Sequence, residues 1–219
     1  MYPYILFDLD GTLTDPGEGI TNSVAYALRQ FGIEVADKRT LYPFIGPPLL
    51  DSFAKYYGMG EADCQRALHE YRVYFRERGM FENALYPQTV WLLQQLRAAG
   101  KHLVLATSKP EEFAEQILAH FDLRQYFDCV AGASMDETRS KKSDVIAYAL
   151  QKTGITAQSA VMVGDRLHDV EGAAKHGLPS VGVLWGYGDE EELRRAGANR
   201  IARDMKQLLT ILTTPSERN

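Results

Sequence analysis

Two aspartates, Asp8 and Asp10, directly follow a short apolar run, residues 4–7, near the start of the chain. Like charges two positions apart at the end of a buried strand have no packing purpose, because burying a charge costs free energy. The pair is therefore a candidate for chemistry rather than packing. The alternative is a solvated acidic turn, and the residues that follow the other apolar runs bear on that choice.

The elements that must position this pair are strands of a parallel sheet. Apolar runs recur at 103–106, 160–163 and 180–184, with a weaker one at 127–132. They are continuously apolar rather than alternating, which is typical of strands that are covered on both faces. Amphipathic helical patterns lie between them. The sequence therefore predicts an α/β fold with a doubly wound, mostly parallel sheet and a Rossmann-like core.

Polar residues follow these runs where each predicted strand ends. Ligands of open α/β sheets bind beyond the carboxyl ends of the strands, so we expect the residues there to converge. Besides the first pair, they are Thr107, Ser108, Lys109, Asp165 and Asp169, with Lys141 and Lys142 near the start of a helix.

Four carboxylates in one crevice, those of Asp8, Asp10, Asp165 and Asp169, repel one another unless a cation holds them. Carboxylate oxygens are hard ligands, and a site that keeps several waters for a phosphate-bearing substrate suits Mg²⁺. A lysine adds positive charge for an incoming dianion, and the hydroxyl of Thr107 can bind phosphate oxygens. Together these groups indicate phosphoryl transfer.

One interval breaks the alternation of strands and helices. More than 90 residues separate Asp10 from the next good strand, and helical stripes fill much of that gap. We expect a helical cap domain at 16–82, inserted into an α/β core formed by 1–15 and 83–219. The loop 44–53 carries Gly46, Pro47 and Pro48 between two predicted helices, and it is a candidate for substrate recognition. A plain helix–helix connector is the alternative.

Composition narrows the function further. The 219 residues are 45% apolar and 24% charged, the net charge is −5, and there is no basic run for nucleic acid. Two cysteines in unrelated contexts argue against a disulfide scaffold. No stretch approaches the roughly 20 apolar residues that cross a membrane. We expect a cytoplasmic protein, monomer or homodimer, whose partner is a small phosphorylated metabolite.

Four ordered segments carry a family resemblance: "DLDGTLTD" (8–15), "ATSK" (106–109), "SKKSD" (140–144) and "VGDRLHD" (163–169). In order and spacing they resemble the motifs of the haloacid dehalogenase-like hydrolase superfamily. The segment "GAAKHGLPSVGVLWGYG" (172–188) is similar to the phosphoglycolate phosphatase-like branch, which has a helical cap.

The resemblance implies roles for these residues. Asp8 is expected to be the nucleophile that forms an aspartyl-phosphate, and Asp10 the general acid–base. Mg²⁺ is expected between Asp8, the backbone carbonyl of Asp10 and Asp165, with Asp169 acting through water or by orienting a ligand. Thr107, with Ser108, Lys109 and Gly46, is expected to bind substrate, and a lysine is expected to neutralise the nucleophile and the phosphate.

Several alternatives stay open at this point. The lysine could be Lys141 or Lys142, and the register of similar sequences favours Lys142. Thr107 could be a plain helix N-cap, and Asp169 could do no more than cap the following helix. A phosphomutase of the β-phosphoglucomutase type is the second candidate function, and a non-catalytic binding module is the third.

Overall fold

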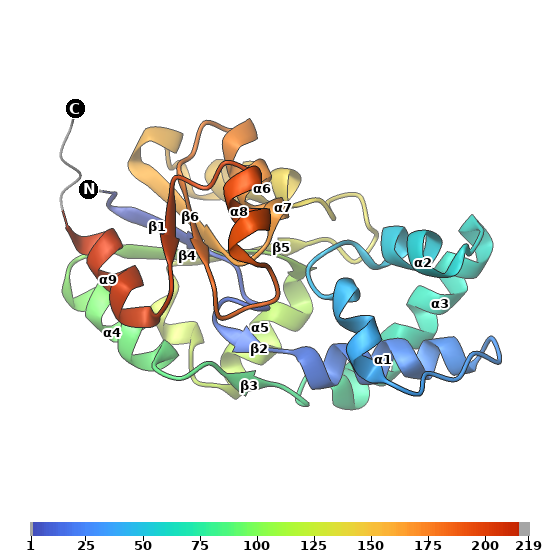
Figure 1. Cartoon of the computed structure of the whole chain (residues 1–219). Coiled ribbons are helices and arrows are strands. Elements are labelled where there is room, and N and C mark those ends of the chain that lie inside the picture. The colour runs from blue at the N-terminus through green and yellow to red at the C-terminus, as the bar shows by residue number, and fades with distance from the viewer. Residues whose placement is uncertain (1, 215–219) are drawn as a thin grey trace. The chain divides into compact units, whose positions relative to one another are not determined.

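The computed structural model describes residues 2–214, which form two compact units (Figure 1). One unit contains the chain up to Thr14 and from Leu85 onward, and the other is Asp15–Ala84. The chain passes between them through a two-stranded ribbon, β2 (Thr14–Asp15) and β3 (Ala84–Leu85). The sequence predicted the inserted segment at 16–82.

The first unit is built on a six-stranded parallel sheet with the order β5-β4-β1-β6-β7-β8. Strand β1 lies at its centre, between β4 and β6, so the residues after β1 lie beside those after both neighbours. The strands are β1 (Tyr4–Phe7), β4 (His102–Pro110), β5 (Cys129–Ala133), β6 (Ala160–Gly164), β7 (Ser180–Val183) and β8 (Arg200–Ala202).

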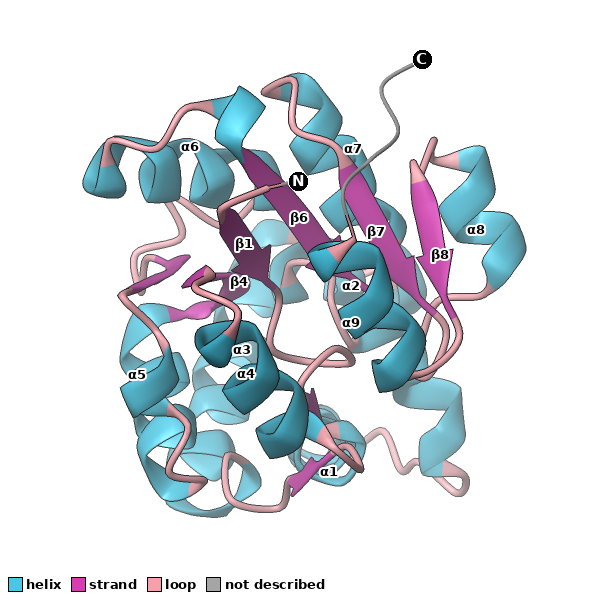
Figure 2. Ribbon diagram, turned by 90° about the vertical axis from the view of Figure 1, so that its left-hand side faces the viewer, coloured by secondary structure: helices cyan, strands magenta, loops and turns pink. Residues whose placement is uncertain are grey.

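Helices cover both faces of this sheet (Figure 2). Leu6 packs in an apolar cluster beneath α6 and α7, while Ile5 and Phe7 are buried on the opposite face, since successive strand residues alternate. Helices α4 and α9 pack together on that opposite face. The helices are α4 (Thr89–Ala98), α5 (Glu111–His120), α6 (Lys142–Thr153), α7 (Leu167–Lys175), α8 (Glu190–Arg195) and α9 (Met205–Thr213).

The second unit is helical. Helix α1 (Gly17–Arg29) packs against α3 (Glu61–Tyr74), and α2 (Leu49–Tyr57) packs on α3 as well. A 3₁₀ helix (Lys38–Phe44) precedes α2, and a π-helical segment (Phe75–Gly79) continues α3. The buried residues of α1 include Ile20, Val24 and Leu28, which share one face of the helix.

The predicted fold class is confirmed: a doubly wound, parallel α/β sheet accompanied by a helical unit. The five predicted strands are present, but β8 was not predicted, because it has only three residues and begins with the exposed Arg200. Within residues 2–214, no helix is long and apolar enough to cross a membrane.

Candidate active site

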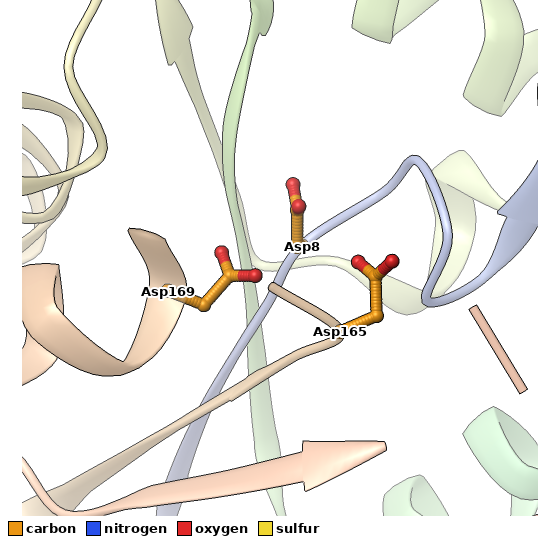
Figure 3. Close-up of side chains that lie close together, drawn as sticks. All are labelled: Asp8, Asp165 and Asp169. Atoms are coloured by element: carbon orange, nitrogen blue, oxygen red, sulfur yellow. The ribbon is translucent and has the colours of Figure 1, made fainter. Parts of the chain in front are cut away.

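Three carboxylates meet at the carboxyl ends of β1 and β6 (Figure 3). Asp8 continues β1, and its backbone N–H donates to the carbonyl of Val163 at 2.9 Å. Asp165 directly follows β6, and Asp169 lies in the first turn of α7. One oxygen from each of the three lies within 4.8 Å of the others, and none of these residues is more than 5% exposed. A solvated acidic turn is therefore excluded.

Lys142, the first residue of α6, supplies positive charge to this cluster. Its Nζ lies 2.8 Å from Oδ1 of Asp8 and 2.8 Å from Oδ1 of Asp169, and it donates to the carbonyl of Ala106 at 3.0 Å. Burial alone favours the neutral amine, but the carboxylates of Asp169 and Asp8 outweigh it and raise the pKa of Lys142. Lys141 is exposed. Of the two candidate lysines, Lys142 is the one that lies in the site.

Asp169 caps α7, as the sequence allowed, and it also contacts another residue of the site. Its Oδ2 accepts the backbone N–H of Arg166 at 3.1 Å, which satisfies a free donor at the start of α7. Its Oδ1 pairs with Lys142 inside the site. Burial raises the pKa of Asp169 from 3.8 to about 6, Lys142 opposes that rise, and the charge of Asp8 adds to it.

Asp165 is held by two neutral donors, one from the loop after β7, which was not predicted to be part of the site, and one from the turn after β1. Its Oδ2 accepts the backbone N–H of Tyr187 at 2.8 Å, and its Oδ1 accepts the hydroxyl of Thr12 at 3.4 Å. The indole of Trp185 donates to the carbonyl of Thr12 at 3.0 Å, which ties this loop to the turn after β1. Burial, together with the charges of Asp169 and Asp8, raises the pKa of Asp165 well above 3.8.

The loop approaches so closely because it contains glycine. A Cβ on Gly186 would lie 2.3 Å from the carbonyl oxygen of Gly11 and 2.4 Å from Oδ2 of Asp165, both impossible contacts. The segment "WGYG" stands directly after the apolar run 180–184, so the strand-end rule could have placed it in the site. It was not predicted because its contribution comes from a backbone N–H, which residue types do not reveal.

Asp10 pairs with a second buried lysine. The Nζ of Lys109 lies 2.9 Å from Oδ2 of Asp10, and the two side chains are only 4% and 11% exposed. Burial raises the pKa of Asp10, Lys109 opposes the rise, and the charge of Asp8 reinforces it. A carboxyl group that holds its proton to higher pH is suited to act as a general acid.

The remaining predicted residues lie at the end of β4 and in the helical unit. Thr107 is a buried β4 residue rather than a helix N-cap, and its Oγ1 accepts the backbone N–H of Lys109 at 3.2 Å. Ser108, also in β4, is half-buried. Gly46 belongs to the helical unit, in the turn before α2, where its φ is +104°. A role for Gly46 in substrate recognition stays a prediction.

The donor set fits a divalent metal ion. Asp8, Asp165 and Asp169 place three buried carboxylates against one lysine, so the cluster has excess negative charge, and all its donors are hard oxygens. A buried cluster of this sign is stabilised by a cation.

A parallel α/β sheet that gathers carboxylates, lysines and a threonine at its strand ends defines an enzyme of the phosphoryl-transfer class. Comparison with known proteins agrees: the haloacid dehalogenase-like hydrolase family matches residues 5–183. The chain belongs to this family, and it is a phosphatase.

Three relatives illustrate the match. A 5′-nucleotidase of Pseudomonas aeruginosa is 43% identical over 211 residues, which are 96% of each chain. The tyrosine-protein kinase PtkA of Mycobacterium tuberculosis is 44% identical over 184 residues, 84% of this chain and 62% of its own length. A crystal structure described as a "predicted phosphatase" from Clostridium acetobutylicum superimposes with a TM-score of 0.95 at 50% identity, covering 97% of this chain and 98% of that one.

Proposed function

We propose that this chain is a Mg²⁺-dependent phosphatase that hydrolyses a small phosphate monoester through an aspartyl-phosphate on Asp8. The observation that carries the proposal is the convergence of Asp8, Asp165 and Asp169 on Lys142 at the central strand ends. Lys142 contacts the proposed nucleophile directly, which lowers the repulsion between Asp8 and an incoming phosphate dianion.

The first step transfers the phosphoryl group to the enzyme. A carboxylate oxygen of Asp8 attacks phosphorus, the bond from phosphorus to the ester oxygen breaks, and Asp10 gives its proton to that oxygen. The hydroxyl of Thr107 donates a hydrogen bond to the transferring group. The raised pKa of Asp10 supports its role as the proton donor.

The second step returns the enzyme to its starting state. Asp10, now ionised, takes a proton from water while the water oxygen attacks phosphorus, and the bond to Asp8 breaks to release inorganic phosphate. The metal would be held by Asp8, Asp165 and the backbone carbonyl of Asp10, with Asp169 orienting the set. When bound, Mg²⁺ supplies charge that stabilises the phosphoryl oxygens.

The substrate class follows from the relatives rather than from the site. Phosphoglycolate-like compounds, sugar phosphates and nucleoside monophosphates all present a phosphate monoester to the same residues. The relative named 5′-nucleotidase, which matches along 96% of both chains, favours nucleoside monophosphates as the first compounds to test. We expect the helical unit, with the loop around Gly46, to select among them.

The test is a panel of phosphorylated metabolites, assayed for phosphate release with and without Mg²⁺. We expect Asp8→Asn to abolish turnover, because an amide oxygen is a poor nucleophile, and Asp10→Asn to slow release of the phosphoenzyme. Asp144→Asn, at an exposed position, is the charge-matched control and should keep full activity. Full activity in Asp8→Asn would rule out the mechanism. Transfer of phosphate between sugar phosphates without its release would instead indicate a phosphomutase.

A further inference from the structure

Lys109 makes a contact that differs from its predicted role as a phosphate ligand. It lies near the end of β4, and its Nζ contacts Oδ2 of Asp10 at 2.9 Å in a largely enclosed ion pair. Exposed ion pairs shift between many geometries, whereas an enclosed pair fixes the orientation of both side chains. Asp10 is therefore held in one orientation.

The two oxygens of Asp10 are consequently unequal. Oδ2 is bound to the ammonium group, whereas Oδ1 is buried and accepts no hydrogen bond from any group in residues 2–214. Buried carboxylate oxygens normally have a donor, so an oxygen without one marks the place of a group that arrives from outside the chain. A hydroxyl or a water molecule is the natural donor to a carboxylate.

The two buried lysines of the site also serve separate carboxylates. Lys142 contacts Asp8 and Asp169, and Lys109 contacts Asp10. This separation keeps the proposed proton carrier attached to its own cation, while the lysine beside the nucleophile stays with the nucleophile. The backbone N–H of Lys109 is also fixed, since it donates to Oγ1 of Thr107.

We propose that Lys109 is a positioning residue for Asp10: by holding Oδ2, it presents Oδ1 to the leaving-group oxygen and afterwards to the attacking water. The inference rests on the proposed function and deepens it, because it predicts which substrates depend on this contact. An alkoxide leaving group, as in sugar or nucleoside phosphates, needs a proton as it departs. A nitrophenolate leaving group does not.

The experiment compares two substrates in Lys109→Met, which removes the ammonium group and keeps most of the apolar stem. One substrate is p-nitrophenyl phosphate, and the other is the best alkyl ester of the metabolite panel. General acid catalysis contributes about 10²–10⁴-fold to a rate. We expect kcat for the alkyl ester to fall by at least about 100-fold and the first phosphorylation step with p-nitrophenyl phosphate to change by less than about fivefold, as measured by the nitrophenolate burst.

The matched control is Lys101→Met. Lys101 is also a buried lysine, and its Nζ donates to the carbonyl of Tyr2 at 2.9 Å, at the opposite end of β4. Lys101→Met should lower the melting temperature and leave the ratio of the rates for the two substrates unchanged. If Lys109→Met does not fold, Lys109→Gln provides a second test, because it keeps a hydrogen-bond donor without the charge. It should also lower the rate for the alkyl ester more than the rate for p-nitrophenyl phosphate.

A double-mutant cycle tests the connection to Asp10 itself. If Lys109 acts through Asp10, Lys109→Met should cost little further activity on the alkyl ester once Asp10→Asn is present. Fully additive losses would overturn the inference. So would a raised KM for both substrates, which indicates direct phosphate binding, or an equal fall for both substrates in the rate of the first phosphorylation step, which indicates a structural role.

These outcomes can be told apart from failure of the proposed function. That failure is seen in the unaltered enzyme, as absent phosphate release or as full activity in Asp8→Asn, and it would remove the inference as well. If the unaltered enzyme hydrolyses both esters through Asp8 and Lys109→Met lowers the rate of the first phosphorylation step equally for both, the inference alone is wrong.

Discussion

Replacing Asp165 with asparagine should stabilise the metal-free protein while abolishing its response to Mg²⁺. In the structure Asp165 accepts hydrogen bonds from the neutral groups of Tyr187 and Thr12, whereas Lys142 pairs with the other two carboxylates of the cluster. Asparagine has nearly the same shape and can keep the hydrogen bond from Tyr187, so the substitution mainly removes one buried negative charge.

The size of the effect follows from the spacing of the carboxylates. Two unit charges 4.8 Å apart repel by about 3 kcal/mol at an effective dielectric constant of about 20. Lys142 offsets part of that repulsion, and desolvation of the charge adds to the cost of keeping Asp165 ionised. We expect Asp165→Asn to raise the free energy of unfolding of the metal-free protein by about 1–3 kcal/mol at pH 8. For a chain of this length, each kcal/mol raises the melting temperature by roughly 2–4 °C.

The stabilisation should depend on pH in a defined direction. The pKa of Asp165 is raised in the folded state, so folding is favoured below the unfolded value of 3.8 and loses stability as pH rises through the folded pKa. As pH falls, the raised pKa lets the wild-type side chain take up a proton, and the protonated carboxyl group resembles the amide. The difference in stability between Asp165→Asn and wild type should therefore be smaller at pH 5 than at pH 8.

Added Mg²⁺ should reverse the order of stability. A ligand at 100 times its Kd stabilises the folded state by about 2.7 kcal/mol, and only the wild type has the complete carboxylate set. The assay is thermal melting in EDTA and in Mg²⁺ at the two pH values, with Asp144→Asn as the charge-matched control. The reasoning is refuted if Asp165→Asn is destabilised equally at both pH values in EDTA, or if Mg²⁺ stabilises both proteins alike.

Two further predictions concern the backbone around the site. A Cβ on Gly164 would lie 2.1 Å from Cγ of Asp169, so Gly164→Ala should displace that carboxylate and lower activity by about 10- to 100-fold. Gly60→Ala is the control, because a Cβ there would have no atom within 4 Å, and this variant should retain activity. The indole of Trp185 donates a hydrogen bond to the turn after β1, close to the proposed metal ligands. In a Trp91→Phe background, the fluorescence of Trp185 should therefore change when Mg²⁺ is added, and it should not change when Asp165→Asn is also present.

Much of this site could be predicted from the sequence because a parallel sheet converts sequence order into spatial order. Asp8, Thr107 and Asp165 are far apart in the chain, yet each follows an apolar run, and adjacent parallel strands end side by side. The same reasoning gave the fold class. Choosing between Lys141 and Lys142 depended on family register, and the structure agrees because only Lys142 is buried.

The partner of Lys109 could not be predicted in this way. The register between β4 and β5 shifts between Thr107 and Pro110, so period-two alternation does not give the direction of the intervening side chains. The contacts of Tyr187 were hidden for another reason, because a backbone N–H carries no residue-type signal. Contacts that depend on an irregular backbone or on main-chain donors therefore require coordinates.

The charge balance of the site explains why its acids can be buried at all. Each lysine neutralises a carboxylate to which the proposed mechanism assigns a step: Lys142 pairs with Asp8, and Lys109 pairs with Asp10. Asp165, held by neutral donors, carries the charge that a divalent ion must satisfy. An additional lysine there would stabilise the metal-free fold and at the same time remove the reason for metal to bind. In the proposed function, the repulsion within this cluster is thus the source of its affinity for Mg²⁺, and the stability without metal and the affinity should change together in every variant that alters Asp165.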